Sequence, residues 1–586
     1  MVRRFLILLL AIGLMSCSSG GSGDGDVLPG PTGPTTNPAT APPSGDRAQL
    51  TYTDFAQSGT SRIVHNNYYL PLGESGAAKH VFSGTLKVER GPMTPSGVFP
   101  GFEVDFFSWQ GFLVPLQRDI LYSGSSQRTL LLSPGKVWSE EADAGFSRAS
   151  FPFILASPYD NRAHNGVASF LYDDTGCTDL RFQIVEESAA WDQFNAHGFF
   201  SMAYTARPAT LYEEQMTAFS AERARRFPTG SWAELEQLAG GSLDHFDDQI
   251  PASDLTFKGA VVDGVLYQPP FETRFGPYPF PEYMRAGAFS VTKSIGASLT
   301  MLRLAQKYGP SVFDLYIKDY LNVTASHDGW DEVTFADCLN MATGIGDNSR
   351  QREEVDTFAD ENKSRMGQWS NALSLEGKLQ VSFQYGNLPW GTDDIVRYNT
   401  THIFVLAAAM DAFLKTKEGE DAELWAMVKE EVLEPIGISV APMMHTIEGD
   451  GSRGVPLFGV GAYPTTDDLA KITTLMQNGG RYEGQQLLDE NHLNEALFRT
   501  NQTHLPLGNH SEDGDPYLYH HAFWSEPFRE GNCYQQMPYM SGFGGNMVLV
   551  LPNGISCFRF ADNHNYNVDG MIQDMQKIRP YCNEAP

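Results

Sequence analysis

Ser290 and Lys293 are three residues apart, and their types and spacing could do covalent chemistry. Apolar residues recur at helical spacing after the serine, so the sequence predicts a helix from Ser290 to about Tyr308, ended at Gly309. Residues three apart share one face of a helix. A lysine whose pKa is lowered by desolvation can accept the serine proton, and a helix N-terminus offers N–H donors to an oxyanion. The pair therefore predicts a serine nucleophile.

A Ser-x-x-Lys pattern alone is weak, because most occurrences are ordinary solvated helix starts. The elements around it strengthen the prediction. Upstream, Phe257–Tyr267 predicts two strands around an Asp-Gly turn, and a loop rich in proline and aromatic residues leads to the serine. Downstream, five further segments follow in a recognisable order. With the serine helix they make six blocks: 290–299, 333–345, 389–400, 434–438, 461–480 and 541–546.

These blocks, within about residues 255 to 580, resemble the serine β-lactamase and penicillin-binding-protein-like superfamily. The similarity is to its branch of class C β-lactamases, esterases and 6-aminohexanoate-oligomer hydrolases. The resemblance implies an α+β fold, with an antiparallel sheet flanked by helices and an all-helical lobe. It implies no metal and no organic cofactor.

Carried over residue by residue, the resemblance makes Ser290 the acylated nucleophile, Lys293 its proton partner and Tyr398 the second member of the proton relay. It places the oxyanion hole at the backbone N–H groups of Ser290 and Phe543. Tyr385 is a rival to Tyr398, because Tyr385-Gly386-Asn387 fits the family's Tyr-x-Asn literally. Tyr385 lacks a predicted helix immediately behind it, which favours Tyr398.

Two departures from the family pattern bear on the substrate pocket. Thr400 stands where Tyr-x-Asn has its amide, and Met540 stands where Lys/His-Thr/Ser-Gly has its cation, followed by Ser541 and Gly542. In the family that cation helps to bind a substrate carboxylate, and methionine cannot do so. The departure favours neutral esters or linear amides over β-lactams and D-alanyl peptides.

The N-terminus predicts export. Residues 1–16 combine a positive start with an apolar run that is too short to span a bilayer, as in a signal peptide. The sequence before Cys17 resembles the bacterial lipobox, which implies lipid attachment to that thiol, and Ser18 after it favours the outer membrane, facing the periplasm. An ordinary secreted protein is the alternative. Residues 17–48 are rich in Gly, Ser, Pro and Thr and predict a disordered tether.

Residues 49–245 predict a separate β-rich N-terminal domain of unknown role, and residues 246–586 the hydrolase domain. Short aromatic or β-branched runs between turn residues indicate the strands. Helices bridge the two regions. The predicted strands are His80–Val88, Gly101–Phe107, Thr129–Leu132 and Leu180–Val185, and the predicted helices are Glu213–Ala224 and Ser231–Leu238.

Charge and cysteine content further limit the partners and the disulfides that the protein can have. The formal net charge of −30 argues against a nucleic-acid partner. Beyond Cys17, five cysteines remain, so at least one is unpaired within the chain; they are Cys177, Cys338, Cys533, Cys557 and Cys582. One bridge among the last three is plausible, and the sequence does not choose the pair. No Cys/His spacing indicates zinc.

The leading hypothesis is a lipid-anchored envelope serine hydrolase of the Ser-x-x-Lys type, acting on small esters or amides. A β-lactamase or DD-peptidase is the second. A non-catalytic envelope binding protein that keeps the fold is the third. The sequence leaves the physiological substrate and the oligomeric state open.

The lipobox yields the first prediction. Replacing the lipid-bearing thiol, Cys17→Ser, should move the protein from the membrane fraction to the soluble fraction without loss of hydrolysis, because the anchor lies outside the folded part. Fractionation followed by immunoblotting measures this. If the variant stays with membranes, the lipoprotein prediction is wrong.

Overall fold

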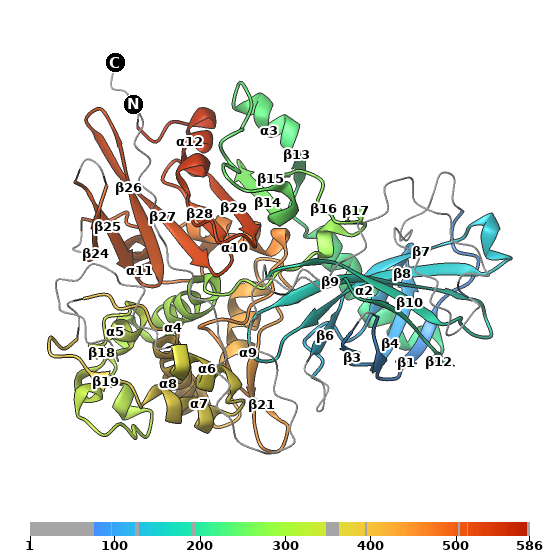
Figure 1. The fold of residues 1–586 in the computed structure, drawn as a ribbon, viewed down its shortest axis with the longest axis horizontal. Coiled ribbons are helices and arrows are strands. Elements are labelled where there is room, and N and C mark those ends of the chain that lie inside the picture. Colours follow the sequence, from blue (N-terminus) through green and yellow to red (C-terminus); the bar gives the residue numbers. More distant parts are fainter. Residues whose placement is uncertain are drawn as a thin grey trace.

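A computed structural model describes residues 55, 76–94, 96–122, 128–189, 192, 195–346, 363–392, 395–501, 504–511 and 514–582. The predicted signal peptide, the lipidation site at Cys17 and the tether lie outside the described residues. Two large sheets and a group of helices make up the described part (Figure 1).

The nine-stranded sheet carries most of the C-terminal half of the chain (upper left in Figure 1). All of its strand pairs are antiparallel except β13 with β15. Its order is β13 (Thr229–Ser231), β15 (Val265–Gln268), β14 (Leu255–Val262), β29 (Ser556–Ala561), β28 (Asn546–Val550), β27 (Cys533–Gly542), β26 (Phe523–Glu530), β25 (Pro516–His520) and β24 (Leu505–His510). The expected turn falls between β14 and β15.

Helices cover both faces of this sheet. Helices α3 (Trp232–Leu238) and α12 (Asp569–Ile578) share one core with its strands, and α10 (Thr466–Gln477) packs on β14, β28 and β29. Further helices form a lobe below the sheet in Figure 1. They are α4 (Leu299–Tyr308), α5 (Phe335–Leu339), α6 (Lys363–Asn371), α7 (Leu375–Ser382), α8 (Thr400–Glu418), α9 (Leu424–Val428) and α11 (Glu490–Ala496). The mixed helix and sheet content predicted from the sequence is therefore present.

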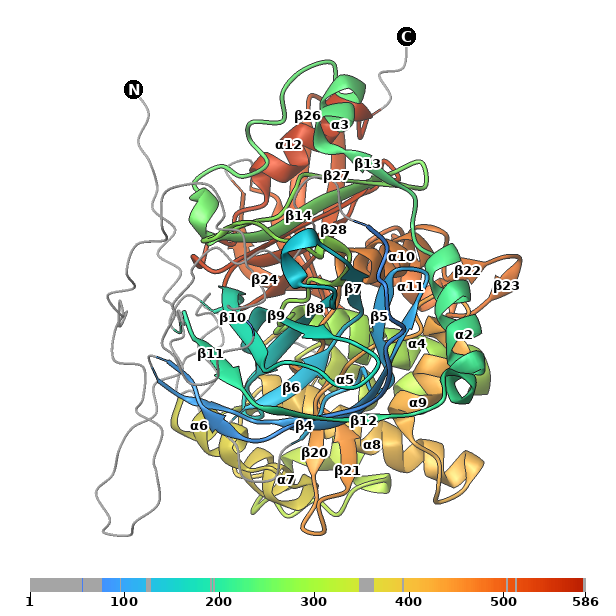
Figure 2. The same cartoon turned by 90° about the vertical axis from the view of Figure 1, so that its right-hand side faces the viewer.

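The N-terminal half forms a ten-stranded antiparallel sheet, at the right in Figure 1 and in front in Figure 2. Its order is β11 (His197–Phe200), β10 (Leu180–Glu187), β9 (Ala163–Tyr172), β8 (Ser147–Ala156), β7 (Gly135–Trp138), β5 (Phe112–Pro115), β4 (Phe102–Trp109), β1 (Ser83–Val88) and β12 (Met202–Ala206), with β6 (Thr129–Leu132) on β8. The four predicted strands fall on β1, β4, β6 and β10. Helix α2 (Glu213–Ala224) packs on β4 and β5 through Met216 and Phe219, where a helix was expected.

A separate N-terminal domain is not confirmed. Ile154, Ala163 and Val167 of the ten-stranded sheet belong to the same buried cluster as Met284 and Val291 beside the serine. In addition, β13 and α3 precede residue 246 yet belong to the second sheet and its cover. The boundary near residue 245 stays a prediction, while the packing between the two sheets is continuous.

The described cysteines include one disulfide. Cys533, at the start of β27, is bonded to Cys582, with a Cα–Cα distance of 6.0 Å. Cys177, Cys338 and Cys557 are free thiols. The bridge is therefore one of the three pairings that the sequence left open.

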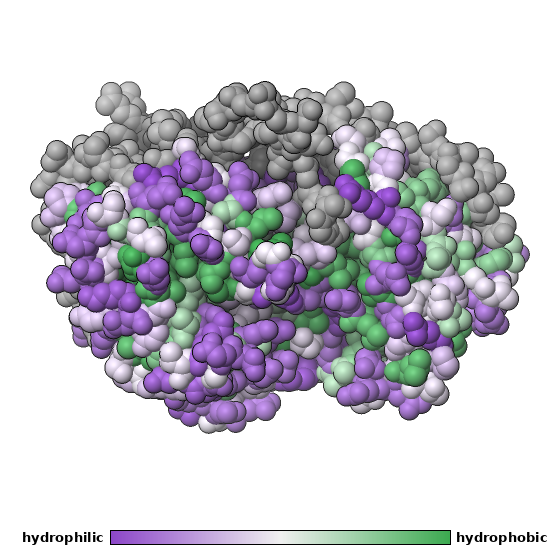
Figure 3. Space-filling view, turned by 90° about the horizontal axis from the view of Figure 1, so that it is seen from below, coloured by the Kyte–Doolittle hydropathy of each residue, from purple (hydrophilic) through white to green (hydrophobic). Residues whose placement is uncertain are grey.

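Apolar and polar residues are interspersed on the face shown in Figure 3, where green patches are interrupted by purple ones. Among the described residues, no helix combines the length and apolarity needed to cross a bilayer.

Candidate active site

The predicted pair meets in the structure. The Lys293 Nζ donates to Ser290 Oγ over 2.8 Å, to Thr400 Oγ1 over 3.0 Å and to the carbonyl oxygen of Gly459 over 2.8 Å. The lysine is 1% exposed, while Ser290 is partly exposed. A buried amine thus lies in hydrogen-bonding contact with the hydroxyl of a partly exposed serine.

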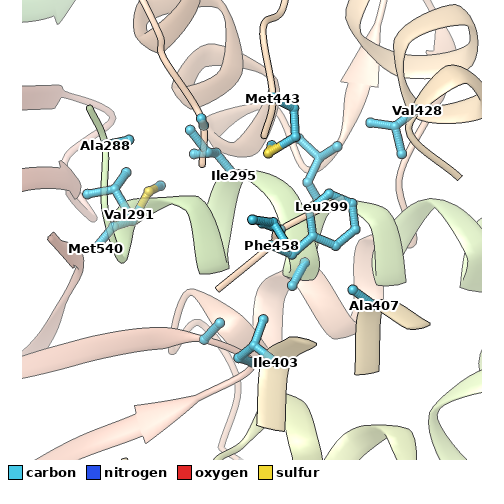
Figure 4. Close-up of a cluster of buried hydrophobic side chains, with 14 of the residues drawn as sticks. Ala288, Val291, Ile295, Leu299, Ile403, Ala407, Val428, Met443, Phe458 and Met540 are labelled. Atoms are coloured by element: carbon cyan, nitrogen blue, oxygen red, sulfur yellow. The ribbon is translucent and has the colours of Figure 1, made fainter. Parts of the chain in front are cut away.

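The local helix explains why the lysine points inward. The segment begins with a π-helical turn, η5 (Lys293–Ser298), and continues as α4. Val291, Ile295 and Leu299 lie in a buried apolar cluster with residues of α8 and the 443–458 segment (Figure 4). Residues 291–302 are all buried, so the helix is held by packing on all sides, and the lysine has polar acceptors within that packing. π-Helical turns occur often at functional sites, and this one starts at the lysine.

The residue before the serine has an uncommon backbone conformation. Phe289 has φ 46°, in the left-handed region, which is unfavourable for a bulky side chain. Its N–H donates to Asn161 Oδ1 over 2.6 Å, and its ring contacts Phe543 edge to face with centroids 5.8 Å apart. Such strain persists only where the surroundings determine it, and here they fix the direction of the serine.

Three polar side chains on β9 or next to the ends of β9 and β10 hold the segment that leads to the serine. Besides Asn161, Asn165 Nδ2 donates to the Arg285 carbonyl oxygen over 2.8 Å, and Ser188 Oγ accepts from Gly287 N–H over 3.2 Å. A Cβ on Gly287 would lie 1.7 Å from the Asn161 carbonyl oxygen, so only glycine permits this approach. The sequence analysis missed these residues. Their partners lie about a hundred positions or more away, so no local pattern marks them.

Of the two candidate tyrosines, Tyr398 lies beside the lysine. Lys293 Nζ is 4.9 Å from the centroid of the Tyr398 ring, and that ring stacks on Trp524 at 5.4 Å. Tyr385 is fully buried, with its ring 6.3 Å from that of His402. The geometry favours Tyr398 over its rival, while its role as a proton relay stays a prediction.

The other predicted pocket residues lie on two elements. Thr400 is the first residue of α8, and its hydroxyl contacts the lysine. Strand β27 ends at Gly542, where a Cβ would lie 2.4 Å from the Ala288 carbonyl oxygen. The missing side chain lets this strand approach the serine turn closely.

Met540 and Ser541 alternate in orientation along β27. Met540 is fully buried and lies beside Ala288 and Val291 (Figure 4), whereas Ser541 is partly exposed. Phe543 follows in the turn between β27 and β28, next to the ring of Phe289. The residues predicted for the nucleophile, the relay and the oxyanion side therefore lie around one serine.

This arrangement suits acyl transfer. In its charged form Lys293 donates to the serine; once deprotonated, the same contact lets the amine accept the hydroxyl proton. The serine is partly exposed, as a nucleophile must be, and the burial of the lysine keeps competing water away from its nitrogen.

Among known proteins, the chain matches solved structures only. No protein-family model matches the chain, and a search of curated proteins finds no match. Solved structures that match include one described as a 6-aminohexanoate-dimer hydrolase from Bacillus anthracis (15% identity, 60% of this chain, 86% of that chain, TM-score 0.41). A penicillin-binding protein homologue from Caulobacter crescentus matches with 14% identity over 62% of this chain and 96% of that chain, with a TM-score of 0.36. A family VIII carboxylesterase matches with 12% identity, 60% and 97% coverage and a TM-score of 0.39.

These matched structures are described as a hydrolase, a penicillin-binding protein homologue and an esterase, kinds of protein that also occur in the superfamily that the sequence blocks resemble. At these identities and TM-scores the matches carry no argument about what the chain does. The functional argument below depends on the side chains of this protein.

The contact between the sheet and the serine turn yields the second prediction. Asn161→Ala removes the acceptor for the Phe289 N–H, and small displacements of a nucleophile are costly. The rate constant for covalent labelling of Ser290 by a fluorophosphonate should fall about 10- to 100-fold.

The matched control is Ser150→Ala, a buried serine of β8 whose Oγ donates to the Ala168 carbonyl oxygen. It should change the labelling rate less than twofold at a comparable loss of thermal stability. Equal labelling rates in both variants would contradict a positioning role for Asn161.

Proposed function

We propose that this protein is a serine hydrolase that acts through an acyl-enzyme on neutral esters or linear amides. The contact of 2.8 Å between Lys293 Nζ and Ser290 Oγ, with the lysine buried, is the observation that carries this proposal. The neighbouring Tyr398 ring supports it. An ordinary solvated helix start, the non-catalytic interpretation of the motif, would have left the lysine exposed.

The proposed reaction has two halves. In the first, Ser290 Oγ attacks the substrate carbonyl carbon while its proton passes to Lys293, and the oxyanion is stabilised by the N–H groups of Ser290 and Phe543. The leaving group takes a proton by way of Tyr398 as its bond to the acyl carbon breaks. In the second half, water attacks the ester carbon, the acid leaves and Ser290 regains its proton.

The substrate class follows from Met540. The Met540 thioether is buried beside Ala288 and Val291 and carries no charge, so a substrate carboxylate near the end of β27 would lose hydration without gaining the cation that the family pattern has at this position. This argument disfavours the β-lactamase and DD-peptidase alternative. The buried Ser290–Lys293 contact argues against a non-catalytic binding protein, since a binding role gives no reason to desolvate an amine beside a hydroxyl.

Two further parts of the proposal concern the rest of the chain. The N-terminal sheet acts as the scaffold that holds the serine turn, whether or not it forms a separate domain. It does so through Asn161, Asn165 and Ser188. A lipid at Cys17 anchors the protein to the bacterial outer membrane, and the sequence after it acts as a tether. No nucleic-acid partner is proposed.

The third prediction tests the nucleophile. Ser290→Ala should reduce ester hydrolysis on the order of a thousandfold or more, leaving what binding and the oxyanion donors provide. It should also abolish fluorophosphonate labelling. Ser298→Ala, a buried serine further along the same helix, is the control and should keep both. Full activity of Ser290→Ala would refute the assignment.

The fourth prediction tests the substrate class. The wild-type kcat/KM for p-nitrophenyl butyrate should exceed that for nitrocefin at least tenfold, or by about 1.4 kcal/mol, because the carboxylate of nitrocefin would be desolvated without a paired cation. Initial rates followed by absorbance measure both. A preference for nitrocefin, together with labelling by fluorescent penicillin, would favour the β-lactamase alternative. The absence of both hydrolysis and labelling would favour a binding protein.

A further inference from the structure

Four of the fourteen histidines of the chain lie together where the turn between β25 and β26 meets α11. The rings of His520 and His521 stack with centroids 3.9 Å apart. His504 lies 5.0 Å from His520, and His492 lies 5.8 Å from His521, both measured between ring centroids. Glu495 of α11 faces the same place, with Oε2 3.9 Å from His520 Nε2. None of these residues takes part in the proposed hydrolysis.

The nitrogens of this cluster are the unusual feature. Both ring nitrogens of His520 and the Nδ1 of His521 are buried without a hydrogen-bond partner among the described residues. The two side chains belong to residues that are 9% and 3% exposed. A buried polar atom without a partner costs about 1–3 kcal/mol, so native proteins rarely keep three of them side by side. One bound cation would satisfy one nitrogen of each ring.

The donor atoms are arranged as such a site requires. One ligand atom from each of Glu495, His520 and His521 lies within 4.8 Å of the other two. Two imidazole nitrogens and one carboxylate oxygen form a ligand set that zinc and its neighbours in the first transition row accept. Magnesium and calcium prefer oxygen ligands, so the histidines disfavour them.

We propose that Glu495, His520 and His521 bind one divalent transition-metal ion, with zinc as the best-matched ion and solvent in the remaining coordination position. The ion would join α11 to the turn between β25 and β26. Its role is structural, since the turn that it binds contacts the helix that follows Ser290.

Two contacts link this turn to its surroundings, one to the residue next to Lys293 and the other to the end of α5. Ser294 follows Lys293 in the chain, and its Oγ donates to the carbonyl oxygen of Ala522 over 2.7 Å. The N–H of His521 donates to Asn340 Oδ1 over 2.7 Å. His521 and Ala522 have φ values of 44° and 69°, so the turn is strained, and an ion bound to its histidines would stabilise the folded form.

The fifth prediction, zinc binding to the full chain, tests the proposal. The protein is prepared without a histidine tag and is first treated with a chelator. Equilibrium dialysis against zinc, followed by elemental analysis, should give one zinc per chain, and zinc should raise the midpoint of thermal unfolding. Glu495→Gln and His520→Gln should each weaken zinc binding at least tenfold and remove the thermal shift. His245→Gln, at a half-exposed histidine outside the cluster, is the matched control and should behave as wild type.

The outcomes separate the proposal from its alternatives. Zinc that binds equally well to wild type and to both cluster variants would lie elsewhere and would overturn the assignment. Wild-type protein that takes up less than half a zinc per chain under saturating conditions would also overturn it. Should His520→Gln fail to fold, two tests still decide: the isosteric Glu495→Gln variant, and the absorption of cobalt bound to the wild type, which is intense for tetrahedral nitrogen and oxygen ligands and weak for cobalt in water.

Discussion

The hydrogen bond from the Phe289 N–H to Asn161 is the interaction on which the candidate site depends most. A bulky residue in the left-handed region costs on the order of 1–2 kcal/mol, and a hydrogen bond of this kind contributes a net 0.5–1.5 kcal/mol. One bond therefore only about offsets the strain. The neighbouring contacts to Asn165 and Ser188, and the donation from Asn546 Nδ2 to the Gly287 carbonyl oxygen, add to it, so two sheets determine one turn together.

The lysine shows how polar groups are accommodated in an otherwise apolar place. Its amine has a hydroxyl from its own helix, a hydroxyl from the first residue of α8 and a backbone carbonyl as acceptors. Thr400 thus has a role beyond the substrate pocket expected for it, because it satisfies the buried amine. An asparagine at this position could offer the same acceptor, so the departure from the family pattern preserves the contact with the lysine.

Local sequence patterns predicted the helices and strands well, but they did not predict the long-range contacts. The short run of aromatic and β-branched residues that predicts β10 is a property of neighbouring residues, and the structure confirms this strand and helix α2. Ser290 and Lys293 were found for the same reason, since three residues on a helix define a face. Asn161 and the histidine cluster gave no such signal, because single polar residues on separate segments form no pattern, and the packing of those distant segments decides which of them meet. The choice between Tyr398 and Tyr385 needed the helix behind the motif.

The contacts that hold the serine turn have a consequence for the order in which the chain becomes functional. Gly287 is bonded to Ser188, 99 positions before it, and to Asn546, 259 positions after it, while Phe289 is bonded to Asn161, 128 positions before it. Loops of this length close slowly, and a chain synthesised from its N-terminus cannot form these contacts until β27 and β28 have emerged. The nucleophile should therefore gain its orientation only near the end of folding. A truncated or half-folded chain would carry the motif without the reactivity.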